Sequence, residues 1–170
     1  MRTIKILFLV KLFLLGVTNV NAQNDKVMAT YLYNFIKFID WPVASQNEEF
    51  VIGVIGETPV YKELEKLVAG RKVYNHPIVL KKFADATVLT RCHVIFLPDN
   101  YSDKIDCILN KFKLFNTLIV CERSGMIKKG SAISFVVQHS KLKYELSKTN
   151  IKNSGLHVDN QLGLLAANVE

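Results

Sequence analysis

The residues of this chain that could do chemistry are few and scattered. The four histidines stand apart, and Cys92, Cys107 and Cys121 form no CxxC pair of the kind that zinc sites use. Cys92 opens one apolar run and Cys121 ends another, so a Cys92–Cys121 disulfide is open if the two runs are neighbouring strands. Buried free thiols are the favoured alternative, and an odd number of cysteines leaves at least one unpaired in either case. We expect no metal site.

No pattern of a nucleophile or of a cofactor loop is present. Gly53 and Gly56 give only GxxG, and the residues after them do not complete a dinucleotide or P-loop fingerprint. There is no GxSxG, and Ser131 and Ser134 have no histidine and carboxylate in a recognisable arrangement. We therefore predict a protein that is not an enzyme, without catalytic residues or cofactor.

Three residues are candidates for binding. Arg71 and Lys72 follow Gly70, and a guanidinium there could hold a carboxylate or another anionic ligand through two hydrogen bonds. The alternative for this pair is an exposed loop or a structural ion pair. Trp41, the only tryptophan, could anchor an interface or lie buried beneath the end of the preceding helix.

The elements that must position these residues start with a helix over residues 26–42. Its apolar residues recur at helical spacing and make one stripe: Val27, Met28, Tyr31, Leu32, Phe35, Phe38 and Ile39. Pro42 lacks the N–H that would continue the helix and disfavours helical geometry at Trp41, so the helix should end there.

After this helix, apolar strand-like runs alternate with helix-like segments. The expected strands are 50–56, 76–83, 92–97, 117–121, 131–138 and 141–147, and the expected helices are 59–69, 101–112, 148–154 and 160–167. Alternating units of this kind imply a largely parallel sheet with right-handed crossovers. We predict a three-layer α/β sandwich of Rossmann-like or flavodoxin-like type, whose mostly parallel sheet is extended by a C-terminal antiparallel hairpin.

Residues 1–22 have the layout of a secretory signal peptide. Arg2 and Lys5 precede an apolar run over 6–17, and small or modest residues lead to a cut after Ala22. The run is shorter than the roughly 20 apolar residues that span a bilayer, which disfavours a retained anchor. Residues 23–170 should then form a single domain in the periplasm.

Charge argues against a nucleic-acid partner. The net charge of the whole chain is +7, but three of its 22 basic residues lie in the predicted signal peptide, which leaves 19 against 15 acidic residues. The remaining lysines and arginines are spread along the chain, whereas nucleic-acid binders concentrate them on one face.

The C-terminal third is the favoured partner surface. Glu145 should lie on the outward face of the second hairpin strand. Ile151 follows in the first of two short helices, and Leu156 lies between the two. If those two apolar residues are partly exposed, charge and apolar anchors meet in a mixture that suits a reversible protein–protein contact. The alternative is that both pack on the sheet while Glu145 is merely solvated.

Several motifs in order along the chain carry a resemblance to a known family. They are TYLYNFIKFIDWP, FVIGVIGETP, GRKV, RCHVIFLP, GSAISFVV, KLKYELS and SGLHVDNQLGLLA. Over residues 26–167 the chain resembles the YfiR family of exported proteins.

The resemblance implies regulation. Members of the family are periplasmic proteins that repress an inner-membrane diguanylate cyclase by contacting its periplasmic sensory domain. This repression lowers the level of cyclic di-GMP and reduces biofilm formation. It also implies homodimers, and disulfides in some members, although three cysteines here cannot form two intramolecular bridges. The receptor could equally be a sensor histidine kinase.

Two other functions stay open. A small-ligand-binding module that reports to its receptor would use the carboxyl edge of the sheet, near residues 56–58 and 97–99. An exported enzyme of unfamiliar type would show a deep polar cleft with clustered titratable groups.

Overall fold

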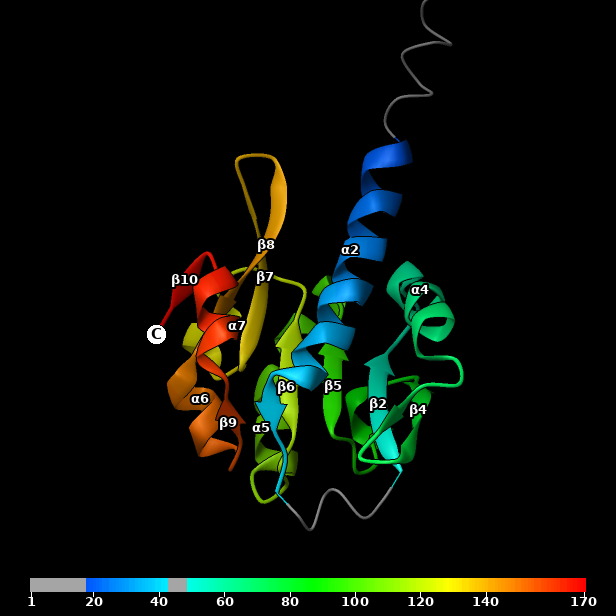
Figure 1. Ribbon diagram of the computed structural model, residues 1–170, viewed down its shortest axis with the longest axis vertical. Helices are drawn as coiled ribbons and strands as arrows, with labels where there is room; N and C mark the ends of the chain where they lie inside the picture. Colours follow the sequence, from blue (N-terminus) through cyan, green and yellow to red (C-terminus); the bar gives the residue numbers. More distant parts are fainter. Residues whose placement is uncertain (1–17, 43–48) are drawn as a thin grey trace, which may run out of the picture.

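The computed structural model describes residues 18–42 and 49–170, with side chains from Ala22 onward. These residues build an eight-stranded sheet (Figure 1). Its strands in spatial order are β10 (Asn168–Val169), β8 (Lys141–Leu146), β7 (Ile133–Gln138), β6 (Leu118–Cys121), β5 (Val94–Leu97), β2 (Phe50–Ile55), β4 (His76–Phe83) and β3 (Lys72–Val73). The five strands from β7 to β4 run parallel, while β8 and β3 pair antiparallel with their neighbours, β7 and β4.

Helices cover both faces of the sheet, which gives the expected three layers. The helical segments are α2 (Thr18–Lys37), α4 (Pro59–Val68), α5 (Ile105–Phe112), α6 (Lys148–Asn153), α7 (Asn160–Leu165), and the 3₁₀ turns η1 (Ala86–Val88), η2 (Asp99–Lys104) and η3 (Met126–Lys129). In Figure 1, α2, α4, α6 and α7 lie in front of the sheet and α5 lies behind it. A separate two-stranded ladder pairs β1 (Ile39–Asp40) with β9 (His157–Val158).

The two-residue period of each strand divides the core between the faces. In β5, Val94 and Phe96 join the cluster under α2 and α4, whereas Ile95 and Leu97 join the cluster under α5. The same alternation holds in β2 and β6, and all positions of β2, β5 and β6 are buried. Strands buried on both faces read as continuous apolar runs, which is why the sequence predicted them well.

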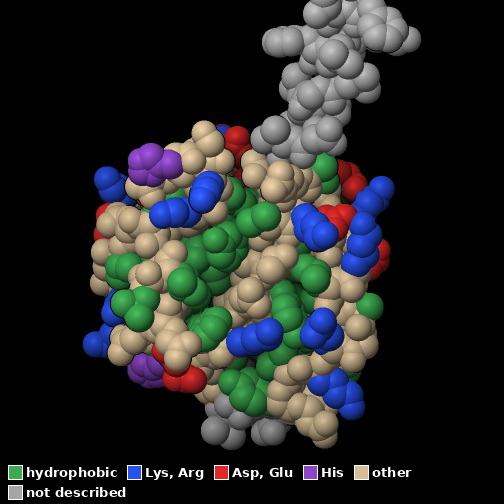
Figure 2. Space-filling view, turned by 45° about the horizontal axis from the view of Figure 1, so that its top comes forward, with side chains coloured by type: hydrophobic (Ala, Val, Ile, Leu, Met, Phe, Trp, Pro, Cys, Tyr) green, Lys and Arg blue, Asp and Glu red, His purple; other side chains and the backbone are tan. Residues whose placement is uncertain are grey.

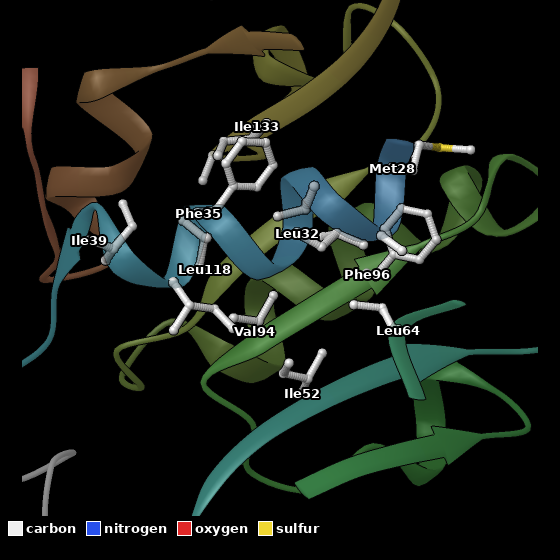
Figure 3. Packing of buried hydrophobic residues seen from close by; sticks show 14 of the residues in the cluster. Met28, Leu32, Phe35, Ile39, Ile52, Leu64, Val94, Phe96, Leu118 and Ile133 are labelled. Atoms are coloured by element: carbon white, nitrogen blue, oxygen red, sulfur yellow. The ribbon is translucent and has the colours of Figure 1, made fainter. Parts of the chain in front are cut away.

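The stripe of α2 packs directly on the centre of the sheet. Figure 3 shows Leu32 and Phe35 of this helix among side chains of the strands, with the Phe35 ring beside Ile133. Phe35 is fully buried, and its ring meets the Tyr144 ring edge-on with centroids 4.9 Å apart. The helix thereby joins the parallel half of the sheet to the C-terminal hairpin.

Three local expectations differ from the structure. The first helix ends at Lys37, because Ile39 and Asp40 leave it to pair with β9. The segment expected as one helix over 101–112 is η2 followed by α5. Ser102, expected as its cap, is buried, and its side-chain hydroxyl makes no hydrogen bond to any described residue. The predicted signal peptide lies outside the described residues, apart from 18–22 in α2.

Candidate functional site

The two apolar residues expected in the partner surface are buried. Ile151 and Leu156 each expose only 1% of their surface and belong to the cluster under α2. Ser147 caps α6 by accepting a hydrogen bond from Asn150 N, which fixes the helix so that Ile151 faces inward. In this structure neither residue can anchor a partner directly, because the partial exposure that the prediction required is not found.

Glu145 has a structural partner of its own. It lies on β8, half-buried, where its Oε2 accepts a hydrogen bond from Gly125 N at 3.0 Å. Gly125 precedes η3 with a φ of 77°, so the carboxylate holds the loop after β6 in place. Any contact of Glu145 with a partner would compete with this bond.

Of the two interpretations of Trp41, an interface anchor or a residue buried beneath the end of the helix, the structure shows the second. It is 3% exposed, and its ring meets the Phe50 ring at 5.0 Å between centroids. Its Nε1 donates to Ile36 O at 3.3 Å, which ties it to the last turns of α2. Trp41 therefore stabilises the end of α2 and does not lie on the surface.

An exposed apolar surface does lie nearby, at the end of the chain. Leu164, Leu165 and Val169 are exposed by 84%, 63% and 39%, and we call them the C-terminal apolar surface. The sequence carried no signal for their exposure, since consecutive apolar residues of a helix can both face the core, as Phe35 and Ile36 of α2 do. Lys148 contributes charge at its border, because its Cε lies 3.7 Å from the position that a Cβ on Gly163 would take.

Arg71 and Lys72 belong to a hollow with an aromatic side. It has a volume of about 230 Å³ and is lined by Tyr33, Ile36, Lys37, Lys72, Val73 and Tyr74; with Arg71 we call it the basic–aromatic hollow. The Arg71 guanidinium lies 4.9 Å from the Tyr33 ring centroid and donates to Tyr33 Oη at 3.2 Å. Lys37 Nζ lies 4.5 Å from the same centroid.

The cations of this hollow are not neutralised by neighbours. Lys37, Arg71 and Lys72 form no ion pair with any residue that the structure describes. Arg71 Nε donates to Leu67 O at 2.7 Å, so the guanidinium is held in place while part of it stays available. The ion pair that the sequence offered as an alternative is therefore absent among the described residues.

A larger hollow lies at the carboxyl edge of the sheet, between α2 and the β7–β8 hairpin. Its volume is about 610 Å³, and we call it the carboxyl-edge hollow; its lining residues are Asn24, Asp25, Met28, Pro59, Asp99, Glu122, Arg123, Ser124, Phe135, Val136, Val137 and Leu142. Figure 2, which brings this edge forward, shows a band of hydrophobic side chains between the hairpin and α2. The hollow includes Asp99, within the edge where a ligand-binding module was expected to use 97–99.

Acidic groups dominate the rim of the carboxyl-edge hollow. Burial raises the pKa of the Asp25 and Glu122 carboxyls, although Asp99 N, which donates to Glu122 Oε2 at 3.0 Å, acts in the opposite direction at Glu122. Arg123 is engaged elsewhere, by Asp99 at 2.6 Å and Asp103 at 3.0 Å. The two half-buried carboxyls, Asp25 and Glu122, thus line the hollow without an ion pair to any described residue.

The cysteines are free thiols, so the Cys92–Cys121 disulfide is wrong for this structure. β5, which follows Cys92, and β6, which ends at Cys121, are indeed neighbouring strands. However, Cys121 pairs with Leu97, five residues beyond Cys92, so the two cysteines lie roughly 16 Å apart along the strand direction at the usual rise per residue. Burial raises the pKa of Cys92 to about 11 and that of Cys121 to about 12, which keeps both thiols protonated near neutral pH. Within the described ranges, no cluster of three or more His, Cys, Asp or Glu residues could hold a metal ion.

Comparison with known proteins gives the family. A family model described as YfiR/HmsC-like matches residues 25–167. The chain belongs to the YfiR/HmsC-like family. This family consists of periplasmic, regulatory and non-catalytic proteins that act in cyclic di-GMP signalling, through the periplasmic domain of an inner-membrane signalling protein. In the part of this family member that the structure describes, no helix combines the length and the apolar character needed to cross a membrane.

The fold is found in a solved structure as well. A crystal structure of a conserved domain protein from Vibrio cholerae O1 biovar El Tor str. N16961 is similar, with a TM-score of 0.52 and 10% sequence identity. The similarity covers 73% of this family member but only 56% of the Vibrio chain, and at this identity it concerns the fold alone. None of the curated proteins compared with the chain matches it.

Proposed function

We propose that this chain is a periplasmic regulator that binds the periplasmic sensory domain of an inner-membrane signalling protein and represses a diguanylate cyclase. Its action would lower cyclic di-GMP and biofilm formation. The observation that carries the proposal is the YfiR/HmsC-like match, which spans nearly the whole described domain. The absence of a recognisable catalytic arrangement in the sequence supports a regulatory role over an exported enzyme.

The C-terminal apolar surface is the favoured contact with the receptor. Its exposed leucines are held on a rigid frame, since Leu162 of the same helix is buried and accepts a hydrogen bond from Tyr144 Oη at 2.7 Å. Apolar side chains bordered by a lysine provide the core and rim that protein–protein interfaces use. This surface replaces Ile151 and Leu156 as the source of apolar anchors.

The test is recovery of the receptor by the exported, processed chain. The chain is immunoprecipitated from detergent-solubilised membranes of its native host, and the co-purifying proteins are identified by mass spectrometry. We expect a membrane protein with a periplasmic sensor domain and a cyclase output, and recovery of folded chain alone would contradict the proposal. A histidine kinase output would replace the cyclase while retaining the regulatory role.

Two substitutions locate the contact. Leu164→Asp should reduce recovery of the receptor at least ten-fold, because it places a charge in the C-terminal apolar surface. Leu114→Asp is the matched control, since Leu114 is 92% exposed after α5 and outside that surface. Equal recovery by both variants would remove this surface from the interface. Homodimerisation stays a prediction, which analytical ultracentrifugation of the processed chain would test.

A second candidate function is the binding of a small anionic ligand that reports to the receptor. The observation that favours it is the basic–aromatic hollow: Lys37 and Arg71 lie against the Tyr33 ring, Lys72 lines the same hollow, and none of the three forms an ion pair with a described residue. An anion with a planar ring would match both the cations and the aromatic side. Benzoate and inorganic phosphate are suitable probes, and Arg71→Ala should abolish any rise in melting temperature that they cause. Lys113→Ala, at an exposed position after α5, is the control.

A further inference from the structure

β7 extends well beyond the strand that pairs with its inner edge. β6 pairs with β7 only at Val120–Ile133 and Cys121–Ser134, whereas β7 continues to Gln138. Figure 1 shows the hairpin rising past the ends of the neighbouring strands. Beyond Ser134, no strand of the described residues pairs with this edge of β7.

The hairpin turn determines which backbone groups face outward. His139 and Ser140 form the two-residue turn, with positive φ of 51° and 58°, the geometry of tight hairpins. The closing pair Gln138–Lys141 is therefore a hydrogen-bonded pair, and such pairs alternate along an antiparallel ladder. At Val137 the N–H and C=O accordingly point away from β8, toward the unpaired edge.

Within the part of the chain that the structure describes, this edge carries none of the usual protections beyond Ser134. Natural edge strands are blunted by lysine, proline, a bulge or a covering element. Residues 135–137 are Phe-Val-Val, and Val137 is 63% exposed. The three residues also line the carboxyl-edge hollow, so the open edge faces a space of about 610 Å³.

The rest of the hollow indicates what would fit beside the edge. Met28, Phe135 and Leu142 offer apolar contacts. The half-buried carboxyls of Asp25 and Glu122 form no ion pair with a described residue, since Arg123 in the same lining is bound to Asp99 and Asp103. A strand presents side chains alternately to its two sides, so a single added strand can meet apolar and charged walls together. The complementary segment alternates apolar residues with lysine or arginine.

We propose that β7 accepts an extended segment of the receptor's periplasmic domain as an added strand, lying in the carboxyl-edge hollow. Main-chain hydrogen bonds to Val137 give affinity, and basic side chains that meet Asp25 and Glu122 give specificity. This mode of binding rests on the proposed regulatory function. It adds a second contact to the C-terminal apolar surface, which lies on α7 and on β10, the strand that pairs with β8.

The decisive variants are Val137→Pro and Val137→Ala. Both remove the valine side chain, but only proline removes the outward N–H, and proline is tolerated on a strand edge whose N–H makes no ladder bond. We expect Val137→Pro to weaken binding of the full processed chain to the purified receptor about ten-fold relative to Val137→Ala, the effect of losing about one main-chain hydrogen bond. Equal binding by the two variants would overturn the proposal.

A second measurement keeps the test independent of how well the proline variant folds. A photo-crosslinking residue at position 137 should label one extended receptor peptide that contains lysine or arginine, while the same residue at Leu114 should not. Failure to label any receptor peptide in a complex that forms would overturn strand addition and leave the hollow to a small ligand. If the unaltered chain captures no receptor at all, the regulatory function itself fails, which is a distinguishable result.

Discussion

The hydroxyl of Tyr144 donates a hydrogen bond to the backbone oxygen of Leu162 at 2.7 Å, and both residues are buried. Tyr144 belongs to β8 and Leu162 to α7, so a single bond joins the hairpin to the helix that presents Leu164 and Leu165. The Tyr144 ring also packs against Phe35 of α2. The first helix, the hairpin and the C-terminal apolar surface are thereby parts of one packed unit.

Tyr144→Phe should lower the free energy of unfolding by about 1–2 kcal/mol, because the Leu162 oxygen would lose its buried donor while the ring packing is retained. Urea unfolding followed by circular dichroism measures the change. Tyr74→Phe is the control, since Tyr74 is exposed. An unchanged midpoint for Tyr144→Phe would mean that the Leu162 oxygen finds another donor.

Ile151→Asp and Leu164→Asp should separate folding from binding. A carboxylate at the buried Ile151 should cost more than about 4 kcal/mol of stability, whereas a change at the 84% exposed Leu164 should stay within about 0.5 kcal/mol. Loss of repression by Ile151→Asp would then reflect unfolding, and loss by Leu164→Asp a missing contact. The melting temperatures of the two processed variants distinguish unfolding from a missing contact. A normally folded Ile151→Asp protein would contradict the observed packing.

Gly56→Ala should be more destabilising than Gly70→Ala, although both glycines have a φ of +68°. The left-handed backbone costs an alanine about 1–2 kcal/mol at either position. At Gly56 the added Cβ would also overlap the Tyr101 ring, which adds about 1–3 kcal/mol, whereas nothing lies within 4 Å at Gly70. Chemical denaturation of the pair gives the difference, and equal losses would show that Tyr101 moves aside freely.

Stability should fall as the solution becomes alkaline. Burial raises the pKa of Cys92 from 9.0 to about 11, that of Cys121 from 9.0 to about 12, and that of Tyr144 from 10.0 to about 12. At pH values between the unfolded and the folded pKa of each group, the unfolded chain has released a proton that the folded chain still holds. The free energy of unfolding therefore decreases as pH rises. The stability that these three protonated groups contribute is fully present below about pH 9, and it is lost as pH rises through their pKa values in the folded chain.

The pH prediction is checked by urea unfolding at a series of pH values from about 8 to about 11. Cys92→Ser should reduce the slope of stability against pH, and Cys107→Ser, at an exposed position, is the matched control. A slope that is the same in the two variants would mean that the Cys92 thiol ionises without a folding penalty.

Much of the architecture was predictable because it depends on local patterns. The strand 76–83 has the predicted bounds, and the helix at Pro59 begins with Thr58 as its cap, accepting from Val60 N at 3.3 Å. Cys121 ends β6 as predicted, but β5 begins at Val94, two residues after Cys92, and the register of the two neighbouring strands was not predictable. Register depends on where each strand enters the sheet, which neither run encodes by itself.

The candidate sites were predictable only in part. Arg71 and Lys72 were singled out, but Tyr33 and Lys37, which complete their hollow, lie in a helix nearly forty residues earlier. Ile151 and Leu156 failed as exposed anchors because their exposure depends on how α6 and the segment after it pack against the sheet, where both residues join the core. The open edge of β7 depends on β6 stopping at Cys121, a relationship between two strands.

Residue order over short spans was enough to predict the class of the fold, the alternation of buried strands and amphipathic helices, and the resemblance to the family. The exposure of particular apolar residues, the distance between the thiols and the backbone edge that faces a hollow became known only from the folded molecule. These properties depend on how segments far apart in the chain pack against one another. Asp25, Glu122 and Val137 share one hollow for that reason alone.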